Sequence, residues 1–149
     1  MTDILKQTLT GMLTEQAQRH PEKVAVTIVG ENVSYADLIA RSDAMARGLR
    51  DLGVGRGDAV ASLADNSADQ ILLEFACARL GAVEVMLNTA YRGDFLTHQL
   101  KVSEPRLIVV DDHLLPTVLE VIGNVPSIRH VVIRGGLGAV PDQIGRAHV

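Results

Sequence analysis

The glycine-rich stretch from Gly53 to Asp58 holds residue types that could bind a phosphate. It reads Gly-Val-Gly-Arg-Gly-Asp, and closely spaced backbone N–H groups at the start of a helix bind anions. Phosphate-binding loops of the familiar kinds lie between a strand and the helix that follows it. This stretch follows a predicted helix and precedes a predicted strand, so we interpret its glycines as a helix C-cap and a turn.

Two consecutive acids, Asp111 and Asp112, follow an apolar run that we expect to be a strand. Carboxylates at the carboxyl end of a strand hold Mg²⁺ for phosphoryl transfer in receiver domains. Too little chain follows these acids to supply the remaining strands of such a domain. We therefore interpret them as a cap at the start of the next helix.

Other residues with metal-binding or nucleophilic chemistry are scattered along the sequence. No histidine has a partner at i, i+4 or a cysteine at metal-ligand spacing, so the pattern predicts no zinc site. The histidines are His20, His98, His113, His130 and His148. Gly-x-Ser-x-Gly elbows and glycine loops that end in Lys-Ser or Lys-Thr are also absent from the sequence, which argues against a hydrolase and a P-loop NTPase.

The integrin-recognition tripeptide Arg-Gly-Asp occurs twice, at residues 56–58 and 92–94. An adhesion domain would need export, and the sequence has neither a secretory signal nor a pair of cysteines for a disulfide. We therefore expect both tripeptides to be ordinary turns.

Helical and strand patterns alternate along the chain, with caps that mark several boundaries. Ser34 with Asp37 resembles a capping box, Asn66 or Ser67 caps the next helix, and Gly81 ends it. We expect helices at about residues 4–19, 34–52, 67–80, 94–102 and 113–122, and strands at about 24–29, 32–34, 58–64, 82–87, 106–110 and 130–134. This order predicts an α/β fold with a mostly parallel sheet and helices on both faces.

Composition and charge exclude several classes of protein. The 149 residues are 47% hydrophobic and 21% charged, which is typical of a folded domain rather than a disordered segment. The net charge of −4 and the scattered basic residues argue against binding to nucleic acid. No transmembrane segment or secretory leader is recognisable, and Cys77 lies in an apolar run as a small core residue, so we expect a cytoplasmic protein.

Short motifs in a fixed order give the chain a resemblance to a known family. They are His-Pro-Glu-Lys-Val-Ala at 20–25, Val-Ser-Tyr-Ala-Asp-Leu at 33–38, Gly-Val-Gly-Arg-Gly-Asp-Ala-Val at 53–60, Asp-Asn-Ser at 65–67, Arg-Leu-Gly-Ala-Val at 79–83 and Leu-Asn at 87–88. Together they resemble the N-terminal region of the acyl-CoA synthetases, in the AMP-binding, adenylate-forming superfamily that also includes luciferases and adenylation domains. Residues 88–100 look like the fatty-acyl or crotonobetaine/carnitine-CoA ligase branch, although Met86 replaces a proline common in relatives.

The resemblance implies an ATP-dependent acid–thiol ligase of the AMP-forming type. In such enzymes a fatty-acid-like carboxylate attacks ATP to form an acyl-adenylate and pyrophosphate, and the thiol of CoA then displaces AMP. The family's phosphate loop ending in Pro-Lys, its later acidic and arginine motifs and its C-terminal lysine are absent here. The resemblance therefore assigns no catalytic, cofactor-binding or metal-binding residue in this chain, and we interpret Asn88, Tyr91 and Arg92 as structural loop residues.

These observations predict an incomplete N-terminal part of an adenylate-forming enzyme. We expect residues 1–143 to be the N-terminal portion of the AMP-binding domain, and residues 144–149, which back-translate to a common sequencing adapter, to be a non-native tail. ATP, Mg²⁺, CoA and the carboxylic acid would bind the full-length enzyme, whereas the fragment alone should be inactive and bind none of them tightly. The alternative is a small stand-alone Rossmann-like or receiver-like nucleotide-binding or interaction domain.

Overall fold

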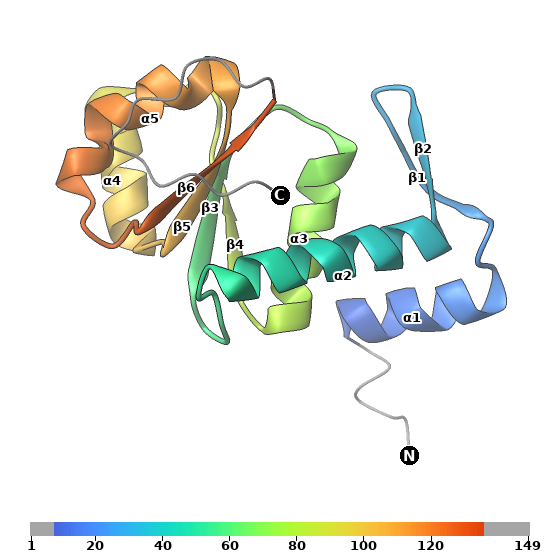
Figure 1. Ribbon diagram of the computed structural model, residues 1–149. Helices are drawn as coiled ribbons and strands as arrows, with labels where there is room; N and C mark the ends of the chain where they lie inside the picture. Colours follow the sequence, from blue (N-terminus) through green and yellow to red (C-terminus); the bar gives the residue numbers. More distant parts are fainter. Residues whose placement is uncertain (1–7, 136–149) are drawn as a thin grey trace.

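A four-stranded parallel sheet forms the centre of the computed structural model, which describes residues 8–135 (Figure 1). Its strand order is β4-β3-β5-β6, and each neighbouring pair is parallel. The strands are β3 (Ala59–Leu63), β4 (Val83–Met86), β5 (Leu107–Asp111) and β6 (His130–Arg134). The predicted α/β class with a parallel sheet is confirmed.

The described residues also form five α-helices and a separate hairpin. The helices are α1 (Leu9–Arg19), α2 (Tyr35–Asp51), α3 (Ala68–Leu80), α4 (Gly93–Ser103) and α5 (Leu115–Val121). Strands β1 (Val24–Ile28) and β2 (Glu31–Ser34) form the antiparallel hairpin. None of these helices is long and apolar enough to cross a membrane.

The hairpin turn is built from Val29 and Gly30, which both have positive φ angles of 49° and 79°. Two successive residues with positive φ are typical of the tight turn that matches the twist of paired strands. Glycine adopts this conformation freely, whereas the branched valine is strained there. The structure therefore ends β1 one residue before the predicted limit.

Side-chain caps fix the start of α2 and α3, as the sequence predicts. The Ser34 hydroxyl accepts a hydrogen bond from the Asp37 backbone N–H at 3.1 Å and donates to the Asp37 carboxylate at 2.8 Å. Ser67, rather than Asn66, caps α3 by accepting from the Gln70 N–H at 3.3 Å. Gly81, with φ of 67°, then ends α3 in the left-handed conformation that favours glycine.

Two helices are shorter than their patterns predict. Helix α1 begins at Leu9 because Thr8 has an extended backbone and accepts the Gly11 N–H as its N-cap, while residues 4–7 of the prediction lie outside the described residues. Helix α5 is flanked by 3-10 turns at Asp112–Leu114 and Ile122–Asn124. Pro116 lies in the first turn of α5, where its missing N–H costs no hydrogen bond.

The helices divide between the two faces of the sheet (Figure 1). Helices α4 and α5 cover one face, which includes Ile108, Val110 and Val131, while α2 and α3 pack against Val60 and Leu107 on the other. Steps in opposite directions along the sheet place crossover helices on opposite faces, because crossovers are right-handed. A third apolar cluster joins α1 and the hairpin to α2 and α3.

Candidate functional site at the carboxyl ends of the sheet

The carboxyl ends of β3 and β5 lie side by side, and the chain leaves them toward opposite faces. Strand β3 leads to α3, whereas the neighbouring strand β5 leads to α5. Open α/β sheets bind ligands at such a switch point, where the two loops diverge. Here it holds Asp65, Asp111, His113 and Arg134, which we name the switch-point cluster.

An ion pair between Asp111 and Arg134 is the centre of this cluster. The two residues are register partners at the ends of β5 and β6. Arg134 donates from Nε to Asp111 Oδ1 at 2.5 Å and from Nη2 to Oδ2 at 2.7 Å. The Asp65 N–H also donates to Oδ2 at 2.8 Å, and Arg134 Nη2 donates to the Asp65 carbonyl oxygen at 3.0 Å. The pair therefore ties the ends of three neighbouring strands together.

These contacts determine the charge state of Asp111, whose exposed fraction is only 6%. Burial by itself would raise the pKa of this carboxyl group. The hydrogen bonds from Arg134 and from the Asp65 N–H outweigh burial and lower the pKa below its ordinary value. Asp111 is therefore an ionised, fully partnered carboxylate at neutral pH.

Asp65, Asp111 and His113 each offer one ligand atom to a common point, and these atoms lie within 4.8 Å of one another. Asp65 and His113 are exposed, and His113 Nε2 lies 3.4 Å from Asp65 Oδ2. Both oxygens of Asp111, however, already accept from Arg134. A divalent cation would have to displace this guanidinium, so the cluster does not fit Mg²⁺.

The sequence interpretation of these residues was correct in part. A helical turn does begin at Asp112, but the Asp111 side chain makes no capping hydrogen bond. Asp111 does occupy the N-cap position of this turn, but its carboxylate accepts from Arg134 and from the Asp65 N–H in place of a helix amide. The proximity of His113 to Asp65 was missed, although the shared edge of parallel strands was a signal for it.

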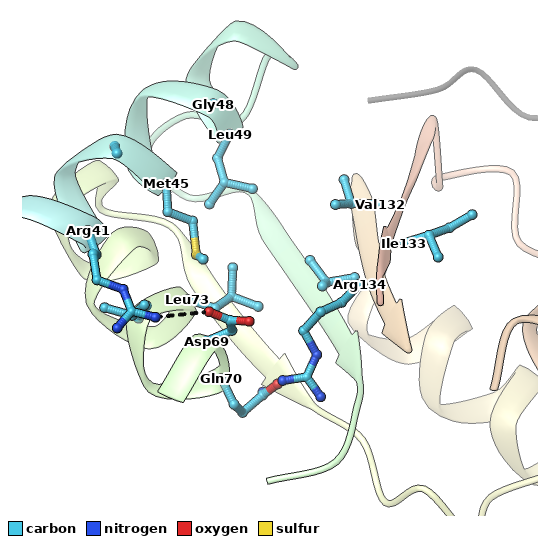
Figure 2. A pocket seen from close by; sticks show the side chains of 13 residues that line it. Arg41, Met45, Gly48, Leu49, Asp69, Gln70, Leu73, Val132, Ile133 and Arg134 are labelled. Atoms are coloured by element: carbon cyan, nitrogen blue, oxygen red, sulfur yellow. Dashed lines mark hydrogen bonds and ion pairs between the residues drawn. The ribbon is translucent and has the colours of Figure 1, made fainter. Parts of the chain in front are cut away.

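An apolar groove begins beside this cluster and runs between α2 and β6. Its volume is about 480 Å³, and Figure 2 shows Met45 and Leu49 from α2 facing Val132 and Arg134 from β6. We name it the α2–β6 groove. Its lining also includes Arg41, Ala44 and Gly48 of α2, Asp69, Gln70, Leu72 and Leu73 of α3, Val109 of β5 and Ile133 of β6.

The charged residues that line the groove are already paired. Arg41 lies 3.4 Å from Asp69 and 2.6 Å from Glu31, and Arg134 is held by Asp111. The groove therefore offers apolar contacts but no surplus charge for an anionic ligand.

A second, half-buried carboxyl group lies on β4, the strand at the edge of the sheet. Glu84 Oε1 accepts from Gln70 Nε2 at 2.7 Å and from the Ser62 hydroxyl at 3.1 Å. Glu84 Oε2 is buried and has no hydrogen-bond partner among the described residues. Burial raises the pKa of Glu84 to about 7, and the negative charge of Glu74 adds to the rise.

Comparison with known proteins places this architecture in a family. The family model described as AMP-binding enzyme matches residues 13–144. The chain belongs to the AMP-binding enzyme family. This confirms the resemblance to the AMP-binding, adenylate-forming superfamily.

Individual relatives agree with the family assignment. The chain is 36% identical over 109 residues to 2-succinylbenzoate–CoA ligase of Oceanobacillus iheyensis, and the matched region covers 72% of this chain and 23% of that protein. It is 31% identical over 138 residues to long-chain fatty acid transport protein 6 of Mus musculus, covering 92% and 22%. The structure of MbtA from Mycobacterium smegmatis superposes with a TM-score of 0.80 at 32% identity, over 88% of this chain and 25% of that one. The chain thus spans about a quarter of the length of these relatives.

The glycine-rich stretch of this family member has a structural role, as its position predicts. The Gly55 N–H donates to the Asp58 carboxylate at 2.8 Å, and the Gly57 N–H donates to the Gly81 carbonyl oxygen at 2.8 Å. The Gly53 N–H donates back to the end of α2, to the Arg50 carbonyl oxygen at 2.8 Å. These amides are engaged within the protein and cannot also cradle a phosphate.

The loop after β4 is likewise held by its own side chains. Asn88 Oδ1 accepts from the Ala90 N–H at 2.9 Å, and Arg92 Nη1 donates to the carbonyl oxygens of Thr89 and Tyr91 at 2.6 and 2.7 Å. The Tyr91 ring centre lies 5.4 Å from that of Phe95. These contacts give Asn88, Tyr91 and Arg92 a structural part in the loop.

Proposed function

We propose that residues 1–143 are the N-terminal portion of an AMP-forming acid–thiol ligase. The enzyme would join a fatty-acid-like carboxylic acid to CoA through an acyl-adenylate. The family match over residues 13–144, with relatives about four times longer, is the observation that carries this proposal.

The proposed reaction has two steps, adenylation of the acid and transfer of the acyl group to CoA. A carboxylate oxygen of the acid attacks the α-phosphorus of ATP, and the bond to pyrophosphate breaks. The sulfur of CoA then attacks the acyl carbon, AMP leaves, and the thiol proton passes to solvent or a base. Mg²⁺ would neutralise phosphate charge in the first step, at ligands outside the residues described here.

The role of this chain in the enzyme is to supply a scaffold. Its paired carboxylate Asp111 and the engaged amides of the glycine-rich stretch support this role, because neither is free to bind phosphate or metal. We therefore propose that the 149-residue chain alone is inactive and binds ATP, Mg²⁺ and CoA only weakly.

Two further predictions rest on the sequence. Residues 144–149, predicted to be a non-native tail, lie outside the described residues. Sequencing the locus from clean template tests this prediction, and a stop codon directly after Val149 would contradict it. A cytoplasmic location likewise stays a prediction.

ATP–pyrophosphate exchange tests the proposed activity. The assay compares the purified 149-residue chain with the complete product of the gene that carries it. Each is given decanoate or 2-succinylbenzoate, acids of the two kinds that relatives' names suggest. We expect exchange with decanoate in the complete product only.

The other outcomes separate the parts of the proposal. Exchange by the isolated chain would show that the scaffold role is wrong. Exchange by the complete product with 2-succinylbenzoate alone would replace the fatty-acid-like substrate with an aromatic acid. A complete product that exchanges with neither acid, and forms no CoA thioester from them, would contradict the substrate proposal as a whole.

A further inference from the structure

Glu84 points from β4 toward helix α3. It is the register partner of Val60, which packs in the same core as α3. Gln70 in the first turn of α3 donates from Nε2 to Glu84 Oε1 at 2.7 Å and to the Ser62 hydroxyl oxygen at 2.6 Å. The Ser62 hydroxyl donates to Glu84 Oε1 at 3.1 Å. We name Ser62, Gln70 and Glu84 the Glu84 cluster, which joins β3, α3 and β4.

The Glu84 cluster offers no positive charge to its carboxyl group. Its two donors, a hydroxyl and an amide, both serve Oε1, and Oε2 is buried without a hydrogen-bond partner among the described residues. The titratable groups of α3 that interact with Glu84 are Glu74 and Cys77, and neither is a cation, while β3 contributes the uncharged Ser62. A protonated carboxyl group fits this site, whereas an ionised one leaves a buried charged oxygen without compensation.

Strand β4 is held less firmly than the other elements that enclose Glu84. Its four residues are exposed or half-buried, and among the described strands it pairs only with β3. Val83 and Met86 are 55% and 63% exposed. Helix α3, in contrast, buries Ala68, Leu72, Leu73, Ala76 and Cys77. A segment with few buried contacts opens at the lowest cost, so an ionised Glu84 reaches water most easily when β4 moves.

We propose that Glu84 makes β4 a pH-sensitive edge of the sheet, closed while the carboxyl group is protonated and opened locally, by release of β4 from β3, when it ionises. The inference goes beyond the proposed function and does not depend on it. Burial raises the pKa of Glu84 to about 7. The closed edge is therefore most stable below the ordinary value of 4.5, and this advantage is lost as pH rises through about 7.

The loop between β4 and α4 would receive this signal. It follows β4 directly and lies at the carboxyl ends of the strands. The contacts that hold it begin at Asn88, whose Oδ1 accepts from the Ala90 N–H at 2.9 Å. Release of β4 would therefore link the ionisation of Glu84 to the position of this loop.

Amide hydrogen exchange tests the inference on two N–H groups that hold β4 to β3. The Val83 and Leu87 N–H groups donate to carbonyl oxygens of the β3 segment at 2.9 and 2.8 Å. The Arg106 N–H donates to the Ala59 carbonyl oxygen from the β5 side of β3 at 2.8 Å and is the internal control. Exchange in the 149-residue chain is followed by NMR at about pH 6 and about pH 8, with the intrinsic effect of pH on the exchange rate removed.

E84Q is the test variant, and E120Q, at an exposed position on α5, is its matched control. In the unmodified chain and in E120Q, the opening constants of the Val83 and Leu87 amides should rise about five- to tenfold between the two pH values, after allowance for solvent screening. In E84Q they should stay constant within about twofold, because the side-chain amide does not ionise.

Urea separates a local opening from global unfolding, which also becomes easier as Glu84 ionises. Release of β4 alone exposes little surface, so the opening constants of Val83 and Leu87 should hardly change at about 1 M urea. The opening constant of Arg106 should increase under the same conditions, because its hydrogen bond lies inside the sheet.

Three results would overturn the inference. They are equal pH dependence in the unmodified chain and E84Q, Val83 and Leu87 openings as sensitive to urea as the Arg106 opening, and β4 amides that already exchange without protection at about pH 6. None of these results bears on ATP–pyrophosphate exchange, so the proposed function stands or fails separately.

Discussion

Asp111, which is buried, and Glu84, which is half-buried, are two carboxyl groups in one small sheet, and their pKa values move in opposite directions. Asp111 lies between β5 and β6 with a guanidinium against both oxygens, and its pKa is lowered. Glu84 on β4 accepts only from a hydroxyl and an amide, and its pKa is raised to about 7. Burial raises the pKa of both groups, so the charge of the partner decides the direction.

The two groups therefore contribute to stability over opposite ranges of pH. The lowered pKa of Asp111 gives stability above its ordinary value of 3.8, which is lost as pH falls through the folded value. The raised pKa of Glu84 makes folding most favourable below 4.5, and this advantage is lost as pH rises through about 7. Four variants test this contrast.

Removal of the guanidinium should have the largest effect. We expect R134M to lower the free energy of unfolding at neutral pH by about 3 kcal/mol, because it leaves Asp111 as an uncompensated buried charge. Urea denaturation followed by circular dichroism measures this. R129M, at an exposed position directly before β6, is the control and should change stability by less than about 0.5 kcal/mol.

The double variant D111N/R134M sharpens the same test. With both charges removed, most of the loss should be recovered, because no charge is left buried without a partner. A double variant as unstable as R134M alone would show that Arg134 acts through packing and not through the charge of Asp111.

Neutralising Glu84 should have a smaller effect of opposite sign. E84Q should raise the free energy of unfolding by about 1–2 kcal/mol at about pH 8, after allowance for solvent screening, and change it little at about pH 4. The physical reason is that ionised Glu84 has one buried oxygen without a partner among the described residues. Thermal unfolding at the two pH values measures it, and an equal effect at both would contradict a raised pKa.

A cation beside Glu84 should produce the smallest change in stability. It should, however, remove the difference in direction between the pKa shifts of Glu84 and Asp111. In Q70K we expect the Glu84 pKa to fall toward that of a paired carboxylate, with a net stability change within about 1 kcal/mol at neutral pH. Stability should then no longer decline between about pH 5 and 7. Q70M is the neutral control, and its decline should persist. The ionisable groups of α3 that interact with Glu84 are Glu74 and Cys77, and both variants leave these two residues unchanged.

Much of the fold could be predicted from local signals in the sequence. Ser34, Ser67 and Gly81 mark helix limits because a cap needs only the backbone of its own turn. The hairpin between β1 and β2 and the parallel order of the larger sheet follow from the same local reasoning. The early start predicted for α1 and the single long helix predicted around α5 were less accurate, because apolar spacing alone does not show the extended backbone at Thr8 or the 3-10 turns that flank α5.

The candidate site was less predictable, since its residues meet only across the sheet. Asp111 and Arg134 are 23 positions apart in the sequence, and Asp65 is farther still. The sequence indicated that acids follow β5, but the arginine that neutralises Asp111 was not identified. The Glu84 cluster and the groove also depend on how α3 and α2 pack on the sheet.

The sequence by itself determined the family, the alternation of strands and helices, and the interpretation of the glycine-rich stretch as a cap and a turn. Each of these depends on residues that are close along the chain or on motifs in a fixed order. The tertiary structure alone decided which carboxyl group is ionised, which face of the sheet remains open and which edge lacks a described partner. These properties depend on which strands become neighbours, and the partner that each side chain finds across the sheet then determines its charge and exposure.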